Sequence, residues 1–347
     1  MRAAPLTTNG VSGAPDLPVA VDAMGGDNAP DQIVAGAVSA RSELGVNVVL
    51  VGPADLAERV DCGGLDVIPA SEVIEMHDDP AMAVRKKKDS SLVRAAEAVR
   101  DGKACAMVSA GNTGAAMASA LFRMGRTKGV ARPAIATPVP VPGGTPTVLV
   151  DSGANADAQP DWLVQFAQMG VVYARERLGI GEPRVALLSI GEEDTKGNAL
   201  VKETRPLFAD GSWNAGCGGS FIGNVEGRDL LSDAADVVVC DGFVGNVALK
   251  TLEGALTFIV SKLFEVFGST DEARAAAEQL LPLLAPLATE LDPDTTGGAG
   301  LVGVDGVCVI SHGSSSATAI VNAVRVGADL AARDFPGAIA RAIRPAV

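Results

Sequence analysis

The chain has 347 residues, and its 28 Lys and Arg against 42 Asp and Glu give a formal net charge of −14. This length is sufficient for one large domain or two joined lobes, and the negative charge argues against non-specific binding to nucleic acid. Hydrophobic residues make up 48% of the chain but aromatic residues only 3%, so we expect a core of Ala, Val, Leu and Ile. The five cysteines form no CxxC pair and no metal-ligand spacing, which is typical of reduced residues in a cytoplasmic protein.

The two parts of the chain differ in composition. Residues 1–18 are rich in Ala, Pro, Thr and Gly, and we predict a flexible tail there, followed by one domain over residues 19–342. The sequence shows no signal-peptide pattern and no run of 18 or more apolar residues, so we expect no segment to span a membrane.

The segment Val19–Pro30 reads V-A-V-D-A-M-G-G-D-N-A-P. A short apolar run that stops at two glycines and a proline predicts a buried strand, a tight turn and the start of a helix. Ligands of open α/β folds bind at the carboxyl ends of strands. We therefore predict a ligand-binding turn that contains Asp22, Gly25, Gly26 and Asp27.

Val-rich segments alternate with helical segments of 10 to 15 residues along the rest of the chain. This alternation predicts an α/β protein with a mainly parallel sheet that is covered on both faces. The other predicted strands lie at 46–51, 67–68, 104–109, 134–138, 147–151, 184–190, 221–224, 237–241 and 306–311.

Polar, glycine-containing clusters follow most of these strands. Any one of them could be a local turn. Together with the opening turn they make seven, and we expect all seven at the same edge of the sheet, where they would line one crevice suited to an anion. The six later clusters are 109–114, 151–155, 191–198, 223–227, 241–246 and 311–316.

Apolar spacing from 248 to 267 predicts a helix. A second apolar stretch covers 280–287, where Pro282 and Pro286 argue against a regular helix. We interpret the pair as core or dimer interface, or alternatively as an acyl-chain groove or a shallow membrane contact.

Several common catalytic motifs are absent. The chain has no GxGxxG after its first strand, no P-loop and no GxSxG. His312 precedes a predicted helix start, so it is a candidate for contacting phosphate or moving a proton, and the alternative is a simple serine cap. Lys196 follows three acidic residues and belongs either to a surface ion-pair cluster or to a site that stabilises developing negative charge. We assign Cys240, inside a Val-rich strand, to the core.

A run of basic residues stands out between positions 123 and 132 of this acidic chain. Such a patch can steer an acidic protein or a phosphate toward a site. The run contains Arg123, Arg126, Lys128 and Arg132.

The motifs taken together resemble those of the bacterial phosphate acyltransferases (PlsX). The matching segments include V-D-A-M-G-G-D, R-K-K-K-D-S-S-L, S-A-G-N-T-G-A, G-E-E-x-x-K-G-N, C-D-G-F-x-G-N and S-H-G-S-S, in the same order along the chain. Two positions depart from the family pattern. Asn28 stands where the family often has His, and Ser152 where it often has Ala or Gly.

This resemblance implies reversible transfer of a long-chain acyl group from acyl carrier protein to inorganic phosphate, giving acyl phosphate for phospholipid synthesis. It implies a three-layer fold similar to isopropylmalate dehydrogenase and phosphotransacetylase, with two interwoven lobes and a protruding helical pair at about 248–291. It further implies a cytoplasmic homodimer with peripheral membrane contact, no metal or other cofactor, and a membrane glycerol-3-phosphate acyltransferase that uses the product.

Matching the motifs residue by residue gives a set of site residues. Lys196 and Asn246 are the candidates for catalysis, and the basic run is the candidate docking site for the carrier protein. The candidates for substrate or phosphate binding are Asp22, Gly25, Gly26, Asp27, Ser109, Asn112, Thr113, Asn155, Asn198, His312 and Ser314.

The chemistry of the reaction agrees with these residue types. Phosphate is itself a nucleophile near pH 7, so the enzyme has to supply an anion pocket and stabilise the oxyanion of the thioester. Three alternatives remain: a phosphotransacetylase-like enzyme that uses acyl-coenzyme A, a non-catalytic membrane-associated binding protein, and a metal-dependent dehydrogenase. The dehydrogenase would take its ligands from Asp22, Asp27, Asp151 and Asp241.

Overall fold

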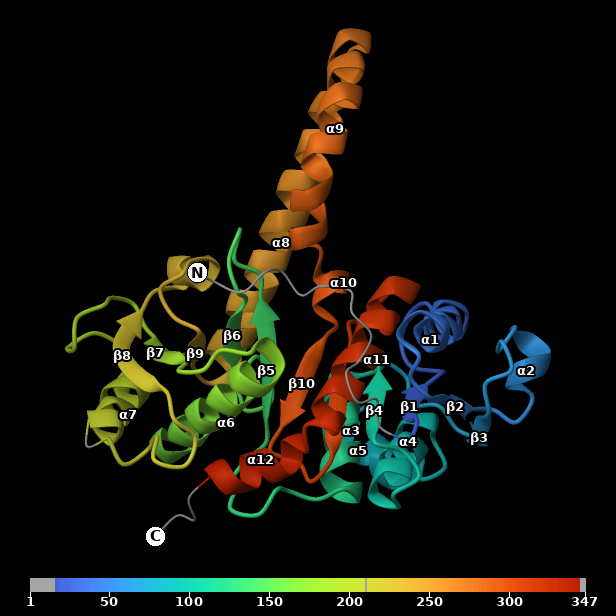
Figure 1. The fold of residues 1–347 in the computed structure, drawn as a ribbon, viewed down its shortest axis with the longest axis horizontal. Helices are drawn as coiled ribbons and strands as arrows, with labels where there is room; N and C mark the ends of the chain where they lie inside the picture. The colour runs from blue at the N-terminus through green and yellow to red at the C-terminus, as the bar shows by residue number, and fades with distance from the viewer. Residues whose placement is uncertain (1–15, 210, 344–347) are drawn as a thin grey trace.

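The structure is a computed structural model that describes residues 16–209 and 211–343. Within these residues one sheet of eleven strands has the order β3-β2-β1-β4-β11-β10-β5-β6-β9-β7-β8 (Figure 1). The strands are β1 (Val19–Asp22), β2 (Val48–Gly52), β3 (Val67–Pro69), β4 (Ala106–Ser109), β5 (Ala134–Val139), β6 (Thr147–Val150), β7 (Arg184–Leu188), β8 (Ser220–Val225), β9 (Val237–Val239), β10 (Ala299–Val302) and β11 (Val307–Ile310).

Every predicted strand is confirmed, with differences of a few residues at the ends. β10 was missed, because its short segment A-G-L-V is flanked by glycines and lacks the Val-rich pattern. Most of the predicted tail, residues 1–15, lies outside the described residues.

Helices cover both faces of the sheet. The helices are α1 (Asp31–Leu44), α2 (Leu56–Arg59), α3 (Pro80–Lys86), α4 (Ser91–Arg100), α5 (Thr113–Arg123), α6 (Pro160–Leu178), α7 (Ala199–Ala209), the 3₁₀ helix η1 (Gly227–Leu231), α8 (Gly242–Phe267), α9 (Asp271–Leu291), α10 (Pro293–Thr296), α11 (Ala317–Ala332) and α12 (Phe335–Ala342). Successive strand residues pack on opposite faces: Val19 and Val21 belong to one core and Ala20 to another. Apart from the edge strands β3 and β8, the strands are therefore largely buried on both sides, as predicted.

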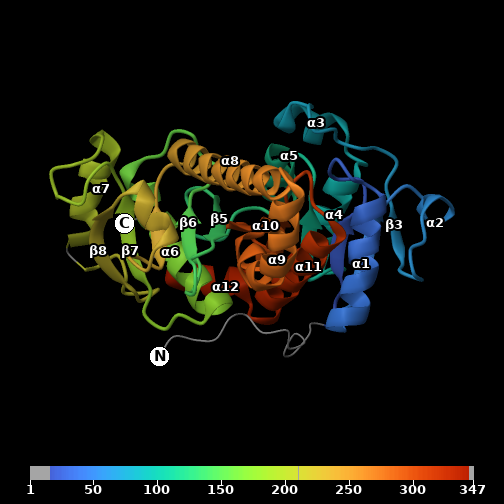
Figure 2. The same cartoon turned by 90° about the horizontal axis from the view of Figure 1, so that it is seen from above.

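The two faces differ in how their cores are divided. On one face α1, α6, α11 and α12 share a continuous core. On the other face one core lies under α4 and α5, and a separate core lies under the first turns of α8, where Ala248, Leu249 and Leu252 pack (Figure 2). The fold is thus three-layered with two lobes joined through one sheet, as predicted.

Three antiparallel pairings reverse the strand direction in the middle of the sheet. β10 is antiparallel to both β11 and β5, and β6 is antiparallel to β5, whereas the other pairings are parallel. We call the edge at the carboxyl ends of β1, β4 and β11 the first edge, and the edge at the carboxyl ends of β6, β7, β8 and β9 the second edge.

The expectation that all seven polar clusters share one edge is wrong. The opening turn and the clusters 109–114 and 311–316 lie at the first edge, and the other four lie at the second edge. The physical reason is that β5 to β6 and β10 to β11 are short connections without a helix, and such hairpin connections reverse direction.

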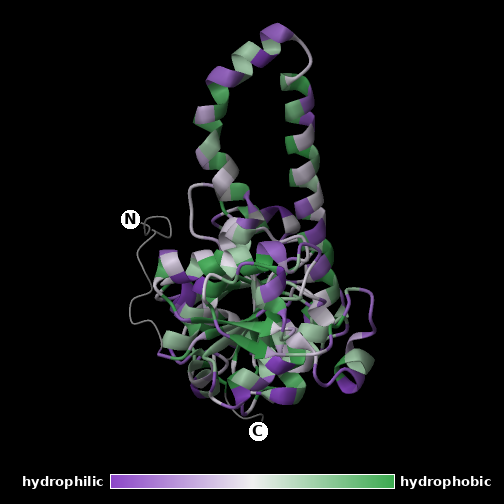
Figure 3. Ribbon diagram, turned by 90° about the vertical axis from the view of Figure 1, so that its right-hand side faces the viewer, coloured by the Kyte–Doolittle hydropathy of each residue, from purple (hydrophilic) through white to green (hydrophobic). Residues whose placement is uncertain are grey.

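Helices α8 and α9 form a hairpin that projects from the body (Figures 1 and 3). The hairpin carries apolar side chains that are exposed, among them Phe258, Phe264 and Leu283. α9 continues through Pro282 and Pro286, so the expectation of an irregular segment is wrong. The two prolines are four residues apart and fall on the same side of the helix, and the carbonyls that lose their N–H partners can bond water because the hairpin stands away from the body.

Helix α8 differs from the expectation that no segment is suited to cross a membrane. By length and composition alone, α8 is long and apolar enough to do so, and little of it is buried in the protein. Ion pairs of Lys250 with Glu253 and of Lys262 with Glu265 interrupt its apolar sequence.

Candidate active site

Loops from β1 and β4 pack closely at the first edge. The Ser109 hydroxyl donates to Asp22 Oδ2 at 2.7 Å and accepts from the Gly111 N–H at 3.0 Å. A Cβ at Gly25 would lie 2.6 Å from the same Asp22 oxygen, so only glycine allows this approach. Burial raises the pKa of Asp22, while hydrogen bonds from Ser91 and Ser109 oppose the rise. Asp22 and Ser109 thus bond to each other and fix the shape of the loop.

The opening turn also contacts the turn after β11. The Asp27 N–H donates to the Gly313 carbonyl at 2.8 Å, next to Gly26, whose φ of 109° favours glycine. The Asn28 amide donates to the Ser314 carbonyl at 3.0 Å. A neutral amide at position 28 therefore holds the two turns together without a titratable group.

The third loop at this edge begins α5. Asn112 Oδ1 accepts from the Ala115 N–H at 3.0 Å, and its Nδ2 donates to the Met76 carbonyl at 2.9 Å. Asn112 is therefore a helix cap, whereas Thr113, the first residue of the helix, is exposed. Of these two predicted ligands, Thr113 is the one whose side chain is accessible to a substrate.

Asp151 organises the second edge. Burial raises the pKa of Asp151, and the hydrogen bond from the Ile135 N–H is the largest effect that opposes the rise. The Asn155 side-chain amide also donates to Asp151, at 2.9 Å, so this predicted substrate ligand is committed to the loop. The backbone N–H groups bound to the carboxylate at 2.7–3.1 Å are those of Ile135, Gly153, Ala154 and Asn155.

Helix α8 begins against this loop. The Gly242 N–H donates to a carbonyl of the loop at 2.7 Å. A Cβ at Gly245 would lie only 1.9 Å from the Asp151 carbonyl oxygen. The next residue, Asn246, is exposed, and its Nδ2 makes a long contact of 3.4 Å with the Ser152 carbonyl. The close packing of Gly245 thus sets the position of Asn246.

Lys196 lies in the exposed loop between β7 and α7. Two of the acids beside it pair with arginines instead: Glu192 with Arg228 at 3.4 Å, and Asp194 with Arg205. In the part of the chain that the structure describes, Lys196 forms no ion pair. The interpretation of Lys196 as a member of a surface ion-pair cluster is therefore not supported.

Lys196 and Asn246 share the second edge, because β7 and β9 are parallel neighbours. No hydrogen bond joins the two side chains within residues 16–209 and 211–343. Asn198 Oδ1 accepts from the Val201 N–H at 2.9 Å, so this predicted ligand caps α7.

α8 connects the two edges. It starts at the second edge, yet Lys250 Nζ lies 3.1 Å from His312 Nε2 in the turn after β11, and 2.8 Å from Glu253 Oε2. Asn246 and Lys250 are four residues apart, which is about 6 Å along a helix axis. Lys250 and Glu253 were not predicted as site residues, although their helical spacing from Asn246 places all three on one face of α8.

The basic run lies at the second edge, since it leads into β5 beside the loop after β6. Arg123 contacts a carboxylate of α4 at 3.4 Å, Arg126 donates to a carbonyl of its own loop at 2.6 Å, and the Arg132 guanidinium lies over the Trp162 ring. Lys128 is exposed. The run therefore places positive charge at the same edge as Lys196 and Asn246.

Comparison with known proteins identifies the family. The family model described as "Fatty acid synthesis protein" matches residues 17–337. A phosphate acyltransferase of Heliobacterium modesticaldum is 47% identical over 329 residues, which cover 92% of this chain and 96% of the relative. A phosphate acyltransferase of Nostoc sp. is 47% identical over 314 residues, 89% and 91% of the two chains. The chain belongs to the phosphate acyltransferase family.

Solved structures confirm the fold of this phosphate acyltransferase family member. A phosphotransacetylase from Streptococcus pyogenes aligns with a TM-score of 0.60 at 15% identity, covering 91% of this chain and 94% of that chain. The EutD phosphotransacetylase from Staphylococcus aureus aligns with a TM-score of 0.57 at 16% identity, covering 92% and 96%. At these identities the likeness concerns the fold alone.

The cysteines of this phosphate acyltransferase family member are poor nucleophiles. Burial, together with Asp151 and Asp241, raises the pKa of Cys240 well above its ordinary value, and burial raises the pKa of Cys105 to about 11. Because the thiolate is the reactive form, we expect iodoacetamide at pH 7 to label native Cys105 about 100-fold more slowly than free cysteine, and native Cys240 not at all. Peptide mass spectrometry would measure this, with the urea-denatured protein as control; rapid labelling of native Cys240 would contradict it.

The carboxylates proposed for a dehydrogenase metal site fall into two groups at different edges of the sheet. Asp22 and Asp27 lie at the first edge, and Asp151 and Asp241 lie at the second. Among the residues described, no group of three or more His, Cys, Asp or Glu side chains is arranged to hold a metal ion. The fold of the described residues therefore does not bring the proposed dehydrogenase ligands into one site.

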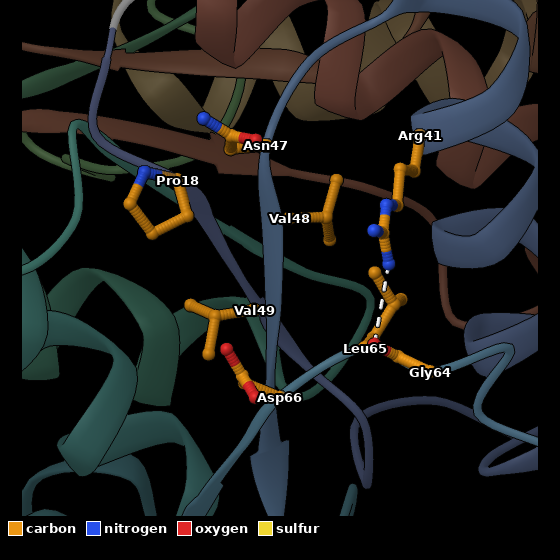
Figure 4. A pocket seen from close by; sticks show the side chains of 8 residues that line it. All are labelled: Pro18, Arg41, Asn47, Val48, Val49, Gly64, Leu65 and Asp66. Carbon is orange, nitrogen blue, oxygen red and sulfur yellow. Dashed lines mark hydrogen bonds between the residues drawn. The ribbon is translucent and has the colours of Figure 1, made fainter.

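A cavity of about 300 Å³ lies elsewhere, at the amino-terminal ends of β1 and β2 (Figure 4). The Arg41 guanidinium, which lines it, donates to the Gly64 carbonyl at 3.2 Å. The predicted phosphate turns follow the carboxyl ends of β1, β4 and β11, so this cavity is not part of the candidate active site. Its other lining residues are Pro18, Asn47, Val48, Val49, Leu65 and Asp66.

Proposed function

We propose that this protein transfers a long-chain acyl group from acyl carrier protein to inorganic phosphate. A phosphate oxygen attacks the thioester carbonyl carbon, the carbon–sulfur bond breaks, and the proton of hydrogen phosphate passes to the leaving thiolate. The products are acyl phosphate and the free thiol of the carrier. Phosphate attacks directly, so no acyl group is held covalently by the enzyme.

The observation that carries the proposal is the position of Lys196 and Asn246 in a chain of this family. They lie at neighbouring strand ends, and no carboxylate among residues 16–209 and 211–343 pairs with Lys196. An ammonium and an amide N–H at one edge are donors suited to the oxyanion that forms when the thioester is attacked.

The first edge supplies the groups suited to phosphate. Its exposed side chains include Thr113, His312 and Ser314, and α11 begins there. The N-terminus of a helix attracts anions through its free N–H groups. α8 links this edge to Asn246 by one helical turn, which supports a phosphate held at the first edge and a thioester held at the second.

An acidic carrier protein would dock on the basic run beside the second edge. We expect the double change Arg126→Glu and Lys128→Glu to raise KM for acyl carrier protein about 10-fold at low salt, because charge reversal removes steering and adds repulsion. The difference should shrink as salt is added. Steady-state kinetics would measure this, with Arg59→Glu on the distant helix α2 as control; an unchanged KM would exclude this surface.

The apolar hairpin supports the remaining parts of the proposal. Its exposed side chains are suited either to a second copy of the chain or to the surface of a bilayer. We propose a cytoplasmic homodimer in peripheral contact with the membrane. An acyl phosphate formed there would pass to a membrane glycerol-3-phosphate acyltransferase for phospholipid synthesis.

One assay tests the function and its alternatives. The purified protein is given palmitoyl carrier protein or palmitoyl-coenzyme A, with and without phosphate, and acyl phosphate is trapped as hydroxamate. We expect hydroxamate only with phosphate and mainly from the carrier protein. Preference for coenzyme A would favour the phosphotransacetylase-like alternative, and no hydroxamate from either donor would rule out the proposed reaction.

A further inference from the structure

A chain of polar contacts runs from α8 to the turn after β11. Lys250 Nζ is 2.8 Å from Glu253 Oε2 and 3.1 Å from His312 Nε2. On the other side of the ring, His312 Nδ1 is 2.8 Å from Ser314 Oγ. These contacts connect the hairpin helix of one lobe with the predicted phosphate turn of the other.

The hydrogen-bond donors among these contacts determine which nitrogen of the His312 ring carries the proton. A lysine ammonium has three N–H donors and no acceptor, so a hydrogen bond between Lys250 and His312 requires Nε2 to accept and to carry no proton. A neutral ring then has its proton on Nδ1, which donates to Ser314 Oγ. The Ser314 N–H also lies 3.4 Å from Nδ1, but a hydrogen bond there would need Nδ1 to accept. Because Nδ1 carries the proton in the neutral ring, the 2.8 Å bond from Nδ1 to Ser314 Oγ forms instead.

The turn that carries Ser314 is held in place by other bonds. The Asn28 amide donates to the Ser314 carbonyl at 3.0 Å, and the Ser315 hydroxyl donates to the His312 carbonyl at 2.6 Å. Because Ser314 Oγ accepts from the ring, its own hydroxyl proton is left to donate to a ligand. That proton lies just before the N-terminus of α11, where an anion is favoured.

We propose that Lys250, held by Glu253, is a positioning residue that keeps His312 in the neutral Nδ1–H form, so that the Ser314 hydroxyl donates its proton to the bound phosphate. This inference rests on the proposed function for the identity of the anion. Helix α8 then acts at both edges. It places Asn246 at the second edge, and through Lys250 it sets the direction of the hydrogen bonds at the first edge.

Nitrogen NMR of the imidazole tests the inference without any assay of activity. The chain has two histidines, so His77→Asn leaves His312 as the one imidazole in a full-length protein labelled with ¹⁵N-histidine. At pH 8 we expect a protonated Nδ1 and an unprotonated Nε2. Lys250→Met should shift the ring toward the Nε2–H form. A protonated Nε2 in the His77→Asn protein, or a ring unaffected by Lys250→Met, would overturn the inference.

Kinetics provide the second readout. Lys250→Met and Ser314→Ala should each raise KM for phosphate about 10-fold with little change in kcat, as expected for the loss of one hydrogen bond to a charged group. The double variant should be no worse than either single variant, because both remove the same donated proton. Additive losses would show that Lys250 acts independently of Ser314 and would refute the coupling.

A matched control lies on the same helix. Lys262 pairs with Glu265 at 2.6 Å with the same spacing, but in the projecting part of the hairpin. Lys262→Met should leave both the tautomer and KM for phosphate unchanged. The two proposals fail separately: absence of acyl phosphate would reject the proposed function, whereas the ring state of His312 decides the positioning role.

Discussion

Replacing Lys196 by Ala is expected to lower kcat for acyl phosphate formation by about 100-fold or more, the usual loss when one oxyanion donor is removed. Lys196 is exposed and forms no ion pair with the described residues, so its removal should leave the fold intact. The effect should appear in kcat more than in KM for phosphate, because the oxyanion exists only in the transition state.

A nearby lysine provides the control. Lys202 is also exposed and lies in the first turn of α7, which follows the Lys196 loop. Lys202→Ala should retain turnover within about twofold. Initial rates of hydroxamate formation would compare Lys196→Ala with Lys202→Ala. Circular dichroism would check that both variants are folded. Near-normal turnover in Lys196→Ala would exclude the proposed role.

Gly245→Ala is expected to destabilise the protein and to reduce acyl transfer together. The new Cβ would lie 1.9 Å from the Asp151 carbonyl oxygen, which is backbone and cannot rotate away. Helix α8 must therefore move off the loop after β6, and overpacking of this kind costs about 1–3 kcal/mol or more. Asn246 is the next residue, so the same shift should displace it from the second edge.

A second glycine on α8 separates this effect from helix propensity. A Cβ at Gly254 meets nothing within 4 Å. Gly254→Ala should therefore be neutral or stabilise the helix by about 0.5–1 kcal/mol. Urea denaturation of both variants measures the difference. Equal stability of the two would show that α8 does not pack on Asp151 as the structure has it.

The asparagines of the candidate site show why the role of such a residue is hard to predict from the sequence. Asn112, Asn155 and Asn198 were predicted as substrate ligands, but each uses its amide to cap a helix or hold a loop. An asparagine after a strand suits either role equally, since both use the same donor and acceptor. Lys196 was predicted as a site residue, and its role stays a prediction; because it forms no ion pair with the described residues, its ammonium is available for a substrate.

The sequence by itself determined ten of the eleven described strands, the polar turns that follow them, the family motifs and the apolar segments of the hairpin. Local composition decides these features, because Val-rich runs, glycine turns and helical spacing each act over a few residues. Only the tertiary structure decided the direction of the strands. Three antiparallel pairings around β10 and β5 send the polar turns to two edges, and one of them joins β10 to β5, two strands that lie far apart in the sequence, which no local pattern specifies. The same long-range packing brings α8 across the sheet, so that Lys250 reaches His312 across 62 positions of sequence.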